Sequence, residues 1–267
     1  MPLFEIIVLA VVQGITEFLP ISSSGHLRIV SDILGLSENT LAIDVAVHVG
    51  TLFAVMLYFW RDLLFILSGL GAAVRGRRHD GAHLAVFLII GSVPVALAGF
   101  FGRALIVDSL RALEIVGWTT IGFGLILWLA DRWGMRILRM EHMSASHAAI
   151  IGLAQALALI PGTSRSGITI TAARFLGYER ADAARFSMLL SIPAITGAGL
   201  LVGVQIAKAG DPVLTHAALV AAGLSFVTAL LAIALFLRWL RFAGFGPFML
   251  YRVIVGAVVL AWVYGAF

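Results

Sequence analysis

Long apolar stretches alternate with short polar ones along most of this chain. Six of the apolar stretches hold about 20 residues each, and a helix of that length crosses the roughly 30 Å hydrocarbon layer of a bilayer. The pattern therefore predicts six transmembrane helices, at about 43–60, 84–105, 113–131, 185–206, 215–237 and 247–266. A further apolar stretch, 63–74, is too short to span a bilayer alone and is predicted to be a helical extension or an interfacial turn.

Two other segments have a different pattern, in which a polar island interrupts the apolar sequence. They cover about 3–35 and 146–177, and each consists of an apolar arm, a break rich in Pro, Ser and Gly, and a short second arm. The second arm is too short to reach the far side of a bilayer. Each segment is therefore predicted to be a re-entrant helical hairpin, because irregular backbone at membrane depth is tolerated only inside protein or beside a water-filled cavity.

The order of these elements repeats in the two halves of the chain. Residues 1–135 and 144–267 each contain one hairpin followed by three predicted spans, within a single integral membrane domain. Three spans in the first half make the second half insert with the opposite orientation, as in inverted-repeat membrane proteins. The predicted fold class is an all-α polytopic membrane protein, with six transmembrane helices and two re-entrant hairpins in an inverted-topology repeat. The two hairpin tips should then meet at one site.

Composition and charge agree with a membrane protein and predict its orientation. Hydrophobic residues make up 61% of the 267 residues, and charged residues only 12%, against about 25% in soluble domains. Cysteine is absent, so disulfides and thiolate metal sites are excluded. Basic residues such as Arg77 and Arg136 gather in alternate short loops, which the positive-inside rule places in the cytoplasm, so both termini are predicted to lie outside. Their placement in short loops also argues against nucleic-acid binding, despite a pI of about 10.1.

The first polar island carries an acid, three serines and a histidine. Gln13 and Glu17 are four residues apart and share one helix face, where a carboxylate can bind a divalent cation, orient water or accept a proton. The residues that follow are Ser22, Ser23, Ser24, Gly25 and His26. Free N–H groups at the start of the second arm, with these hydroxyls, form a predicted anion-binding cradle, and the histidine can transfer protons. The simpler alternatives are an acid that reaches the membrane interface, a single serine N-cap and a structural histidine.

The second polar island centres on Arg165. Its neighbours Ser164 and Ser166 add hydroxyls, while Gly162 and Gly167 allow the backbone to approach a ligand closely. A guanidinium group presents a fork of donors that matches phosphate oxygens, and it keeps its charge when buried. The competing interpretation is an interfacial anchor for lipid headgroups.

Weaker polar signals lie within the predicted spans. Asp44 and His48 are one helical turn apart, and Arg252 lies in the last span; each either lines a cavity or forms a structural pair. Gly199 and Gly203 form a small-xxx-small pattern that can pack helices within or between protomers, but the motif is common in spans and does not decide oligomerisation. A homodimer is one possible assembly.

Together, these groups indicate phosphoryl chemistry on a lipid. Phosphoryl transfer needs a positioned nucleophile and stabilisation of charge on the phosphate oxygens, and a metal ion often supplies part of that stabilisation. A site that opens within the membrane suits a lipid phosphate better than a soluble metabolite. The alternative is a lipid-phosphate transporter or flippase, alone or in addition to hydrolysis, because inverted repeats with broken helices are also a transporter architecture.

The two islands, at 13–26 and 161–167, resemble the two signature motifs of the bacterial undecaprenyl-diphosphate phosphatases of the bacitracin-resistance type. The resemblance covers essentially the whole chain, including 91–94, 191–193 and 247–252. It implies conversion of undecaprenyl diphosphate to undecaprenyl phosphate, which recycles the lipid carrier for peptidoglycan synthesis and confers bacitracin resistance. It also implies a place in the bacterial inner membrane with the active site facing the periplasm.

The same resemblance assigns residues to the site. The active centre is expected to comprise Glu17, Ser23, His26 and Arg165, with substrate-binding contributions from Ser22, Ser24, Gly25, Ser164, Ser166 and Gly167. In the mechanism this suggests, Ser23 attacks the terminal phosphorus while His26 moves the proton. Arg165 and the hairpin N–H groups hold phosphate oxygens, and Glu17 positions a metal ion or a base. A rival mechanism has His26 as the nucleophile, with water completing hydrolysis.

A divalent cation, Mg²⁺ or Ca²⁺, is expected by family resemblance. Its expected ligands are Glu17 and Gln13. The family motif carries either Glu or Gln at the position of Gln13, so Glu17 is the only carboxylate of the motif in this chain.

Overall fold

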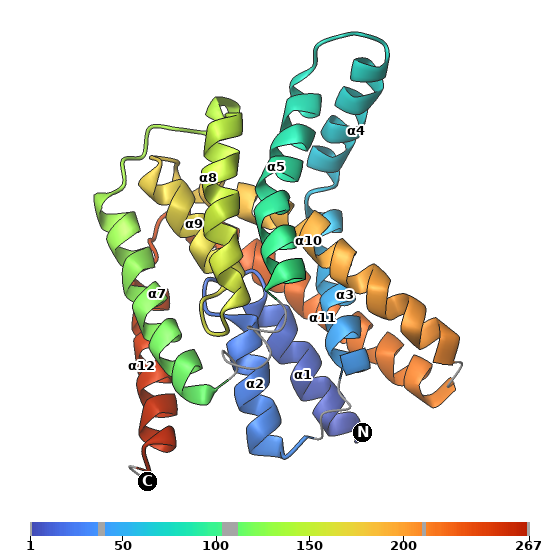
Figure 1. Cartoon of the computed structure of the whole chain (residues 1–267), viewed down its shortest axis with the longest axis vertical. Coiled ribbons are helices and arrows are strands. Elements are labelled where there is room, and N and C mark those ends of the chain that lie inside the picture. The colour runs from blue at the N-terminus through green and yellow to red at the C-terminus, as the bar shows by residue number, and fades with distance from the viewer. Residues whose placement is uncertain (1, 37–40, 103–111, 210–211, 266–267) are drawn as a thin grey trace.

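The computed structural model describes residues 2–36, 41–102, 112–209 and 212–265 (Figure 1). Within these residues the chain is helical and forms no β-strand, apart from one isolated bridge between Leu138 and Tyr178. The helices are α1 (Leu3–Thr16), α2 (Ser23–Leu34), α3 (Leu41–Tyr58), α4 (Trp60–Val74), α5 (Asp80–Phe101), α7 (Leu113–Trp133), η2 (Met140–His142), α8 (Ala145–Ala156), η3 (Leu157–Leu159), α9 (Arg165–Phe175), α10 (Arg180–Ala209), α11 (Pro212–Trp239) and α12 (Gly246–Val263). The all-α prediction is confirmed for this part of the chain.

Helix length and composition identify the candidate membrane spans among the described residues. Four helices are long and apolar enough to cross a membrane, namely α5, α7, α12 and the part of α11 at Thr215–Trp239. The bent pair Ala42–Tyr58 and Trp60–Val74 counts as a fifth if it is one broken span. Because each of these helices matches a predicted apolar stretch, the chain is a polytopic helical membrane protein.

Two parts of the span prediction remain untested. The stretch 185–206 lies in the 30-residue helix α10, but the side-chain surroundings of its last turns, which contain Gly199 and Gly203, are not described. The homodimer therefore stays a prediction. The ends of the stretches 84–105 and 247–266 also lie outside the described residues.

The short stretch 63–74 forms α4, which continues α3 after a bend of 76°. The bend falls next to Phe59, whose φ of −99° and ψ of 28° interrupt the helix. Asp62, in the first turn of α4, forms an ion pair with Arg185 of α10. This pair fixes the start of α4 against the rest of the molecule, since a half-buried charge needs a partner.

The pairs α1–α2 and α8–α9 approach the centre of the molecule from opposite ends (Figure 1). Each pair turns back through a short irregular segment that contains a proline, Pro20 in the first and Pro161 in the second. Proline lacks an N–H donor and its ring blocks continuation of the preceding helix. The Ser166 hydroxyl donates to the Leu19 carbonyl at 2.9 Å, so the two predicted hairpin turns lie side by side.

Glycines let the first arm of each hairpin pack closely on a neighbouring helix. A Cβ atom at Gly14 of α1 would lie 2.8 Å from the Ser225 carbonyl and 2.8 Å from Thr228 Cβ of α11. A Cβ atom at Gly152 of α8 would lie 2.7 Å from the Gly91 Cα atom of α5. Since packed interiors leave no room for such overlaps, these contacts let the first arm of each pair approach its neighbouring helix more closely than a larger residue would allow.

A buried charge network holds the outer end of α9. Asp131 Oδ1 accepts hydrogen bonds from Arg174 Nε at 3.2 Å and from Arg180 Nε at 2.7 Å, and Oδ2 accepts from Arg180 Nη2 at 2.7 Å. The main-chain N–H of Phe245 also donates to Asp131. Arg174 is fully buried and donates further to main-chain carbonyls of the segment that follows α7. The network therefore connects the second hairpin to α7, α10 and the start of α12.

Candidate active site

Helices α2 and α9 begin with the same local structure. Their N-cap residues are Ser22, with φ 72°, and Ser164, with φ 73°, which are the two non-glycine residues with positive φ in the described part of the chain. Each hydroxyl accepts the N–H of the glycine three residues on, Gly25 at 3.3 Å and Gly167 at 3.1 Å. Left-handed backbone is costly for serine, and the cap bond offsets part of that cost. The two turns therefore share the same positive φ at the cap serine and the same cap hydrogen bond.

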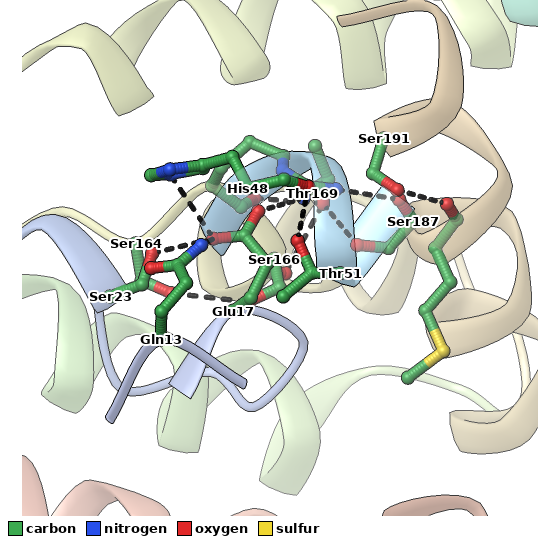
Figure 2. A network of polar contacts seen from close by, with 12 residues as sticks. Gln13, Glu17, Ser23, His48, Thr51, Ser164, Ser166, Thr169, Ser187 and Ser191 are labelled. Atoms are coloured by element: carbon green, nitrogen blue, oxygen red, sulfur yellow. Dashed lines mark hydrogen bonds and ion pairs between the residues drawn. The ribbon is translucent and has the colours of Figure 1, made fainter. Parts of the chain in front are cut away.

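The Glu17 carboxylate is the centre of the site, with Gln13, Ser23 and His48 around it (Figure 2). Glu17 directly follows α1 and is only 7% exposed. Its Oε2 atom accepts hydrogen bonds from Gln13 Nε2 at 2.9 Å and Ser23 Oγ at 2.7 Å. Its Oε1 atom accepts from Arg165 Nη2 at 2.6 Å. An acid and a hydroxyl from the first hairpin therefore meet a cation from the second, which satisfies the buried charge.

Arg165 is held on a second side by α10. Its Nη1 atom donates to the main-chain carbonyl of Ser187 at 3.2 Å. The Ser187 hydroxyl lies 2.7 Å from Thr169 Oγ1, one turn further along α9. These contacts orient the planar guanidinium group, which still has donors for a bound oxyanion.

His26 lies in the first turn of α2 and contacts α12. Its Nδ1 atom is 2.7 Å from the Ser22 carbonyl oxygen, and its Nε2 atom is 2.6 Å from the Tyr251 hydroxyl. The described contacts include no hydrogen bond between His26 and Ser23. The sequence-based mechanism gives the Ser23 proton to His26, whereas the observed hydrogen-bond partner of Ser23 is Glu17.

The other predicted binding residues surround the two N-caps. Ser164 and Ser166 hydroxyls are 3.2 Å apart and both residues are buried. Ser24 is exposed, and its hydroxyl is 3.4 Å from that of Ser22. Both cap glycines are buried, and their N–H groups are those bound by the cap hydroxyls. Every site residue expected from the sequence therefore lies in or next to the two turns.

One of the weaker sequence signals also reaches the site. His48 Nε2 lies 3.9 Å from Glu17 Oε2, and the imidazole is anchored by a 2.6 Å contact between Nδ1 and the Asp44 carbonyl oxygen. The His48 side chain is 35% exposed, so it borders the site rather than filling it. A histidine there adds a second group that can be charged beside the buried carboxylate.

Arg252 binds both hairpin turns from α12. It is fully buried, and its Nη1 atom donates to the Pro20 carbonyl at 3.2 Å. Its Nη2 atom donates to the carbonyls of Gly162 and Thr163, both at 3.0 Å, and its Nε atom donates to that of Thr120 in α7 at 2.9 Å. Among the ion pairs of the described residues, none involves Arg252. Main-chain dipoles therefore balance this cation.

Sequence reasoning missed three residues that contact the site. Thr169 had a usable signal, because it lies four residues after Arg165 and so on the same helix face. Ser187 appeared only as an isolated hydroxyl in an apolar stretch, and Tyr251 as an aromatic residue near the end of the chain. Their roles depend on packing between distant elements, which a sequence pattern does not contain.

The oxygen atoms near Glu17 fit a divalent cation that takes only some of its ligands from the protein and the rest from water and substrate. Gln13 Oε1 is buried without a hydrogen-bond partner, on the residue whose amide nitrogen binds Glu17. The described residues contain no group of three or more His, Cys, Asp or Glu that could hold a metal ion. Magnesium typically uses one or two carboxylates and completes its shell with water and substrate phosphates. Gln13 and Glu17 suit that arrangement and do not form a complete protein cage.

The helices and the buried centre define a polytopic membrane protein with one polar site enclosed between two hairpin turns. The chain matches the family described as bacitracin resistance protein BacA over residues 6–258, and it belongs to that family. It is 48% identical to undecaprenyl-diphosphatase 1 of Rhodospirillum rubrum, over 99% of this chain and 96% of that protein. It is 49% identical to the undecaprenyl-diphosphatases of Ruegeria pomeroyi and Jannaschia sp., over 99% of this chain and 100% of each relative. The resemblance stated from the two motifs is confirmed.

Proposed function

We propose that this chain removes the terminal phosphate of undecaprenyl diphosphate and so regenerates undecaprenyl phosphate for peptidoglycan synthesis, which confers bacitracin resistance. Membership of the BacA family and near-full-length similarity to undecaprenyl-diphosphatases support the proposal. The observation that carries it is the partly buried cluster of Glu17, Ser23 and Arg165, which combines a base, a hydroxyl nucleophile and a phosphate-binding cation. None of the comparisons favours the alternative of a polyprenyl-phosphate transporter.

The contacts of Ser23 support a covalent mechanism in which Glu17 is the base. Because Ser23 Oγ donates to Glu17 Oε2 at 2.7 Å, the carboxylate is placed to take the hydroxyl proton as Oγ attacks the terminal phosphorus. The bond between Oγ and phosphorus forms, the bond from phosphorus to the bridging oxygen breaks, and undecaprenyl phosphate leaves. Water then attacks the seryl phosphate and gives a proton to His26, while the bond between phosphorus and Oγ breaks and Glu17 returns its proton to Oγ. Inorganic phosphate leaves with the proton that His26 gives back.

Arg165 and the N–H groups at the starts of α2 and α9 are proposed to hold the phosphate oxygens. Helix N-termini favour anions, and a guanidinium group binds phosphate through paired donors. Arg165 contacts Glu17 through Nη2 and Oε1 at 2.6 Å, whereas Ser23 donates to Oε2. The remaining guanidinium donors would therefore bind phosphate while Oε2 accepts the serine proton.

A divalent cation, Mg²⁺ or Ca²⁺, is the proposed cofactor. Glu17 and the free Oε1 atom of Gln13 would hold it, with the remaining ligands from the diphosphate and water. When bound, the cation would neutralise part of the charge on the phosphate oxygens. Gln13 would then have two functions, as a donor to Glu17 and as a cation ligand.

We further propose that six transmembrane helices surround two re-entrant hairpins, in an inverted-topology repeat of residues 1–135 and 144–267. The opposite approach of α1–α2 and α8–α9 and the matching serine caps support this arrangement (Figure 1). Helix α10 and the broken α3–α4 span would complete the set of six with α5, α7, α11 and α12. The positive-inside rule then places the α4–α5 turn in the cytoplasm of a bacterial inner membrane, with the site facing the periplasm.

Phosphate release from undecaprenyl diphosphate by the purified protein tests the function. The wild-type protein should release inorganic phosphate with Mg²⁺ or Ca²⁺, and Glu17→Ala, Ser23→Ala, His26→Ala and Arg165→Ala should each lower the rate, by about 100-fold or more for Glu17 and Arg165. Glu5→Ala, which removes a carboxylate from the first turn of the same helix, is the control. No release under any cation condition would overturn the function. Full release by all four variants would overturn the site but leave the function standing.

Trapping of a phospho-enzyme identifies the nucleophile. The proposed mechanism predicts an acid-stable phosphoserine at Ser23, and the rival mechanism predicts an acid-labile phosphohistidine at His26. Rapid acid and alkaline quenching followed by peptide mapping distinguishes the two. A phosphohistidine would end the Ser23 mechanism.

A further inference from the structure

We propose that Tyr251 is a positioning residue for His26, and that its hydroxyl and ring hold the Nε2 lone pair of the imidazole in a fixed position for proton exchange. The inference rests on the proposed function, because it concerns a residue that acts on the same reaction. It is drawn from the contacts of two side chains that lie near opposite ends of the chain.

Both ring nitrogens of His26 have a partner, and the two partners select one tautomer. Nδ1 is 2.7 Å from the Ser22 carbonyl oxygen, which can only accept, so Nδ1 carries a hydrogen. Nε2 is 2.6 Å from the Tyr251 hydroxyl. In a neutral imidazole with a hydrogen on Nδ1, Nε2 holds the lone pair, so the phenol donates to it. The opposite tautomer would set the Nδ1 lone pair against the carbonyl oxygen.

The phenol ring also fixes the plane of the imidazole. The two rings are stacked with centroids 5.6 Å apart and an angle of 6° between their planes. The next residue along α12, Arg252, donates to the carbonyls of Pro20 and Gly162 in the two hairpin turns. Because these bonds fix α12 against both turns, the Tyr251 hydroxyl has a set position relative to α2.

A simpler interpretation is that a phenol in an apolar environment merely uses His26 to satisfy its hydroxyl. The two interpretations differ in what happens to His26 when the Tyr251 hydroxyl is removed. If Tyr251 positions His26, removal of the hydroxyl frees the Nε2 end of the imidazole and slows the step that uses it. If the bond only satisfies the phenol, the imidazole and the chemical step stay unchanged.

Tyr251→Phe tests this difference, because it keeps the stacked ring and removes only the hydroxyl. We expect kcat to fall about tenfold with KM within about twofold of the wild-type value, as for loss of one hydrogen bond that serves the chemical step. Tyr264→Phe is the matched control, since the Tyr264 hydroxyl, just beyond the end of α12, donates to Glu114 at 2.6 Å. That variant should retain the wild-type kcat. An unchanged kcat in Tyr251→Phe would overturn the proposal.

The tautomer itself can be measured by ¹⁵N NMR of labelled histidine in the protein without substrate. The His26 signals are assigned by their loss in His26→Gln. Both proteins should keep hydrogen on Nδ1, because the Ser22 carbonyl still accepts it, but the Nε2 signal should move downfield in Tyr251→Phe, where its lone pair loses the phenol donor. An identical Nε2 signal in both would overturn the proposal. Because this measurement needs no turnover, it stands even if the wild-type protein releases no phosphate, which would defeat the proposed function instead.

A double-mutant comparison shows whether Tyr251 acts through His26. If it does, adding Tyr251→Phe to His26→Gln should cause no further loss of phosphate release, because the residue that Tyr251 positions is already absent. The measurement compares the single and double variants at saturating substrate. A further tenfold loss in the double variant would mean that Tyr251 acts independently, and the proposal would be wrong.

Discussion

Gln13 is the site residue whose two amide atoms have the most different surroundings. Its amide nitrogen donates to Glu17, while its amide oxygen is buried without a partner. A glutamate in the same place would lose the donor and set two carboxylates together in a buried site. Like charges at that distance oppose each other unless a cation lies between them.

Gln13→Glu should therefore make the protein more dependent on divalent cations. In EDTA we expect the melting temperature to fall by roughly 5 °C or more, because two adjacent buried carboxylates repel. Added Mg²⁺ or Ca²⁺ should restore most of that loss, whereas the wild-type protein should change little. Thermal unfolding in detergent, with and without the cation, measures the effect.

Gln155→Glu is the control for that experiment. Gln155 is also fully buried, and it also precedes an N-cap serine by nine residues, but its amide donates to the Gly91 carbonyl at 3.0 Å. A carboxylate at this position has no described acidic neighbour with which to share a cation. The melting temperature of the Gln155→Glu variant should therefore be low in EDTA and stay low with Mg²⁺. Equal cation responses in the two variants would contradict a cation site at Gln13.

For the candidate site, the sequence predicted which residues lie together but not how they are connected. Clustering of polar groups in two motifs was enough to select Glu17, Ser23 and Arg165, since polar residues in an apolar chain are costly without a function. The pairing of Ser23 with Glu17 instead of His26 was not predictable, because His26 turns toward a tyrosine 225 positions away in the chain. Such a contact depends on how α12 packs, and local spacing does not encode it.

At the scale of elements, the two N-cap serines combine a helix cap with left-handed backbone. Glycine accepts that backbone without cost but lacks the hydroxyl, and alanine lacks the hydroxyl and keeps the strain. The two substitutions therefore separate the contributions of the cap bond and of the backbone conformation.

Ser22→Ala and Ser164→Ala should each destabilise the protein more than the corresponding glycine variant. Loss of the cap costs about 1 kcal/mol, and relief of the strained backbone returns about 1 kcal/mol in the glycine variants only. Melting temperatures of the four variants provide the measurement. Glycine variants that are less stable than the alanine variants would contradict the backbone argument.

The close contact between α1 and α11 leads to a second prediction, which concerns helix packing. Gly14→Ala should destabilise the protein by about 1–3 kcal/mol, because the added methyl group overlaps the Ser225 carbonyl. Gly223→Ala on α11 is the control, since its added Cβ has no atom within 4 Å. That change should be neutral or slightly stabilising. Thermal unfolding distinguishes the two, and equal stabilities would contradict the tight helix contact.

Helix positions were largely predictable, because apolar stretches of about 20 residues have few alternatives in a membrane. The stretch 63–74 shows the limit. Its length excluded a full span, but the 76° bend before α4 falls beside Phe59, where the apolar pattern gives no sign of a break. The nearby ion pair between Asp62 and Arg185 joins residues far apart in the sequence, so it leaves no periodic signal either.

For the molecule as a whole, Arg252 is the residue that joins the two halves of the chain. It donates to carbonyls in both hairpin turns and in α7. Main-chain carbonyls in irregular turns need donors when they are buried, and a guanidinium group supplies several at once. The relative position of the two halves therefore depends on this side chain.

Arg252→Lys should lose most of these bonds, because an ammonium group is smaller and cannot reach all the carbonyls together. We expect a loss of about 3 kcal/mol or more in stability, together with loss of phosphate release. Arg238→Lys, at an exposed position near the end of α11, is the control and should resemble the wild-type protein. Retained stability and activity in Arg252→Lys would show that the turns do not need this clamp.

The absence of cysteine makes the orientation of the whole chain directly testable. The α4–α5 turn and the N-terminus lie at opposite ends of the molecule (Figure 1). In intact cells with a permeabilised outer membrane, Arg77→Cys should resist a membrane-impermeant thiol reagent, and Pro2→Cys should react. Both should react after the inner membrane is opened. The reverse labelling pattern would invert the proposed topology.

The matching caps of α2 and α9 have a consequence for the number of sites that the chain can hold. Ser23 and Arg165 are each the first residue after a cap serine, so they occupy equivalent places in the two turns. A chain with a serine in both places would lack the guanidinium group of Arg165, and one with arginine in both would lack the hydroxyl of Ser23. The two turns therefore supply different groups from equivalent places, so together they can form one reactive centre and not one each.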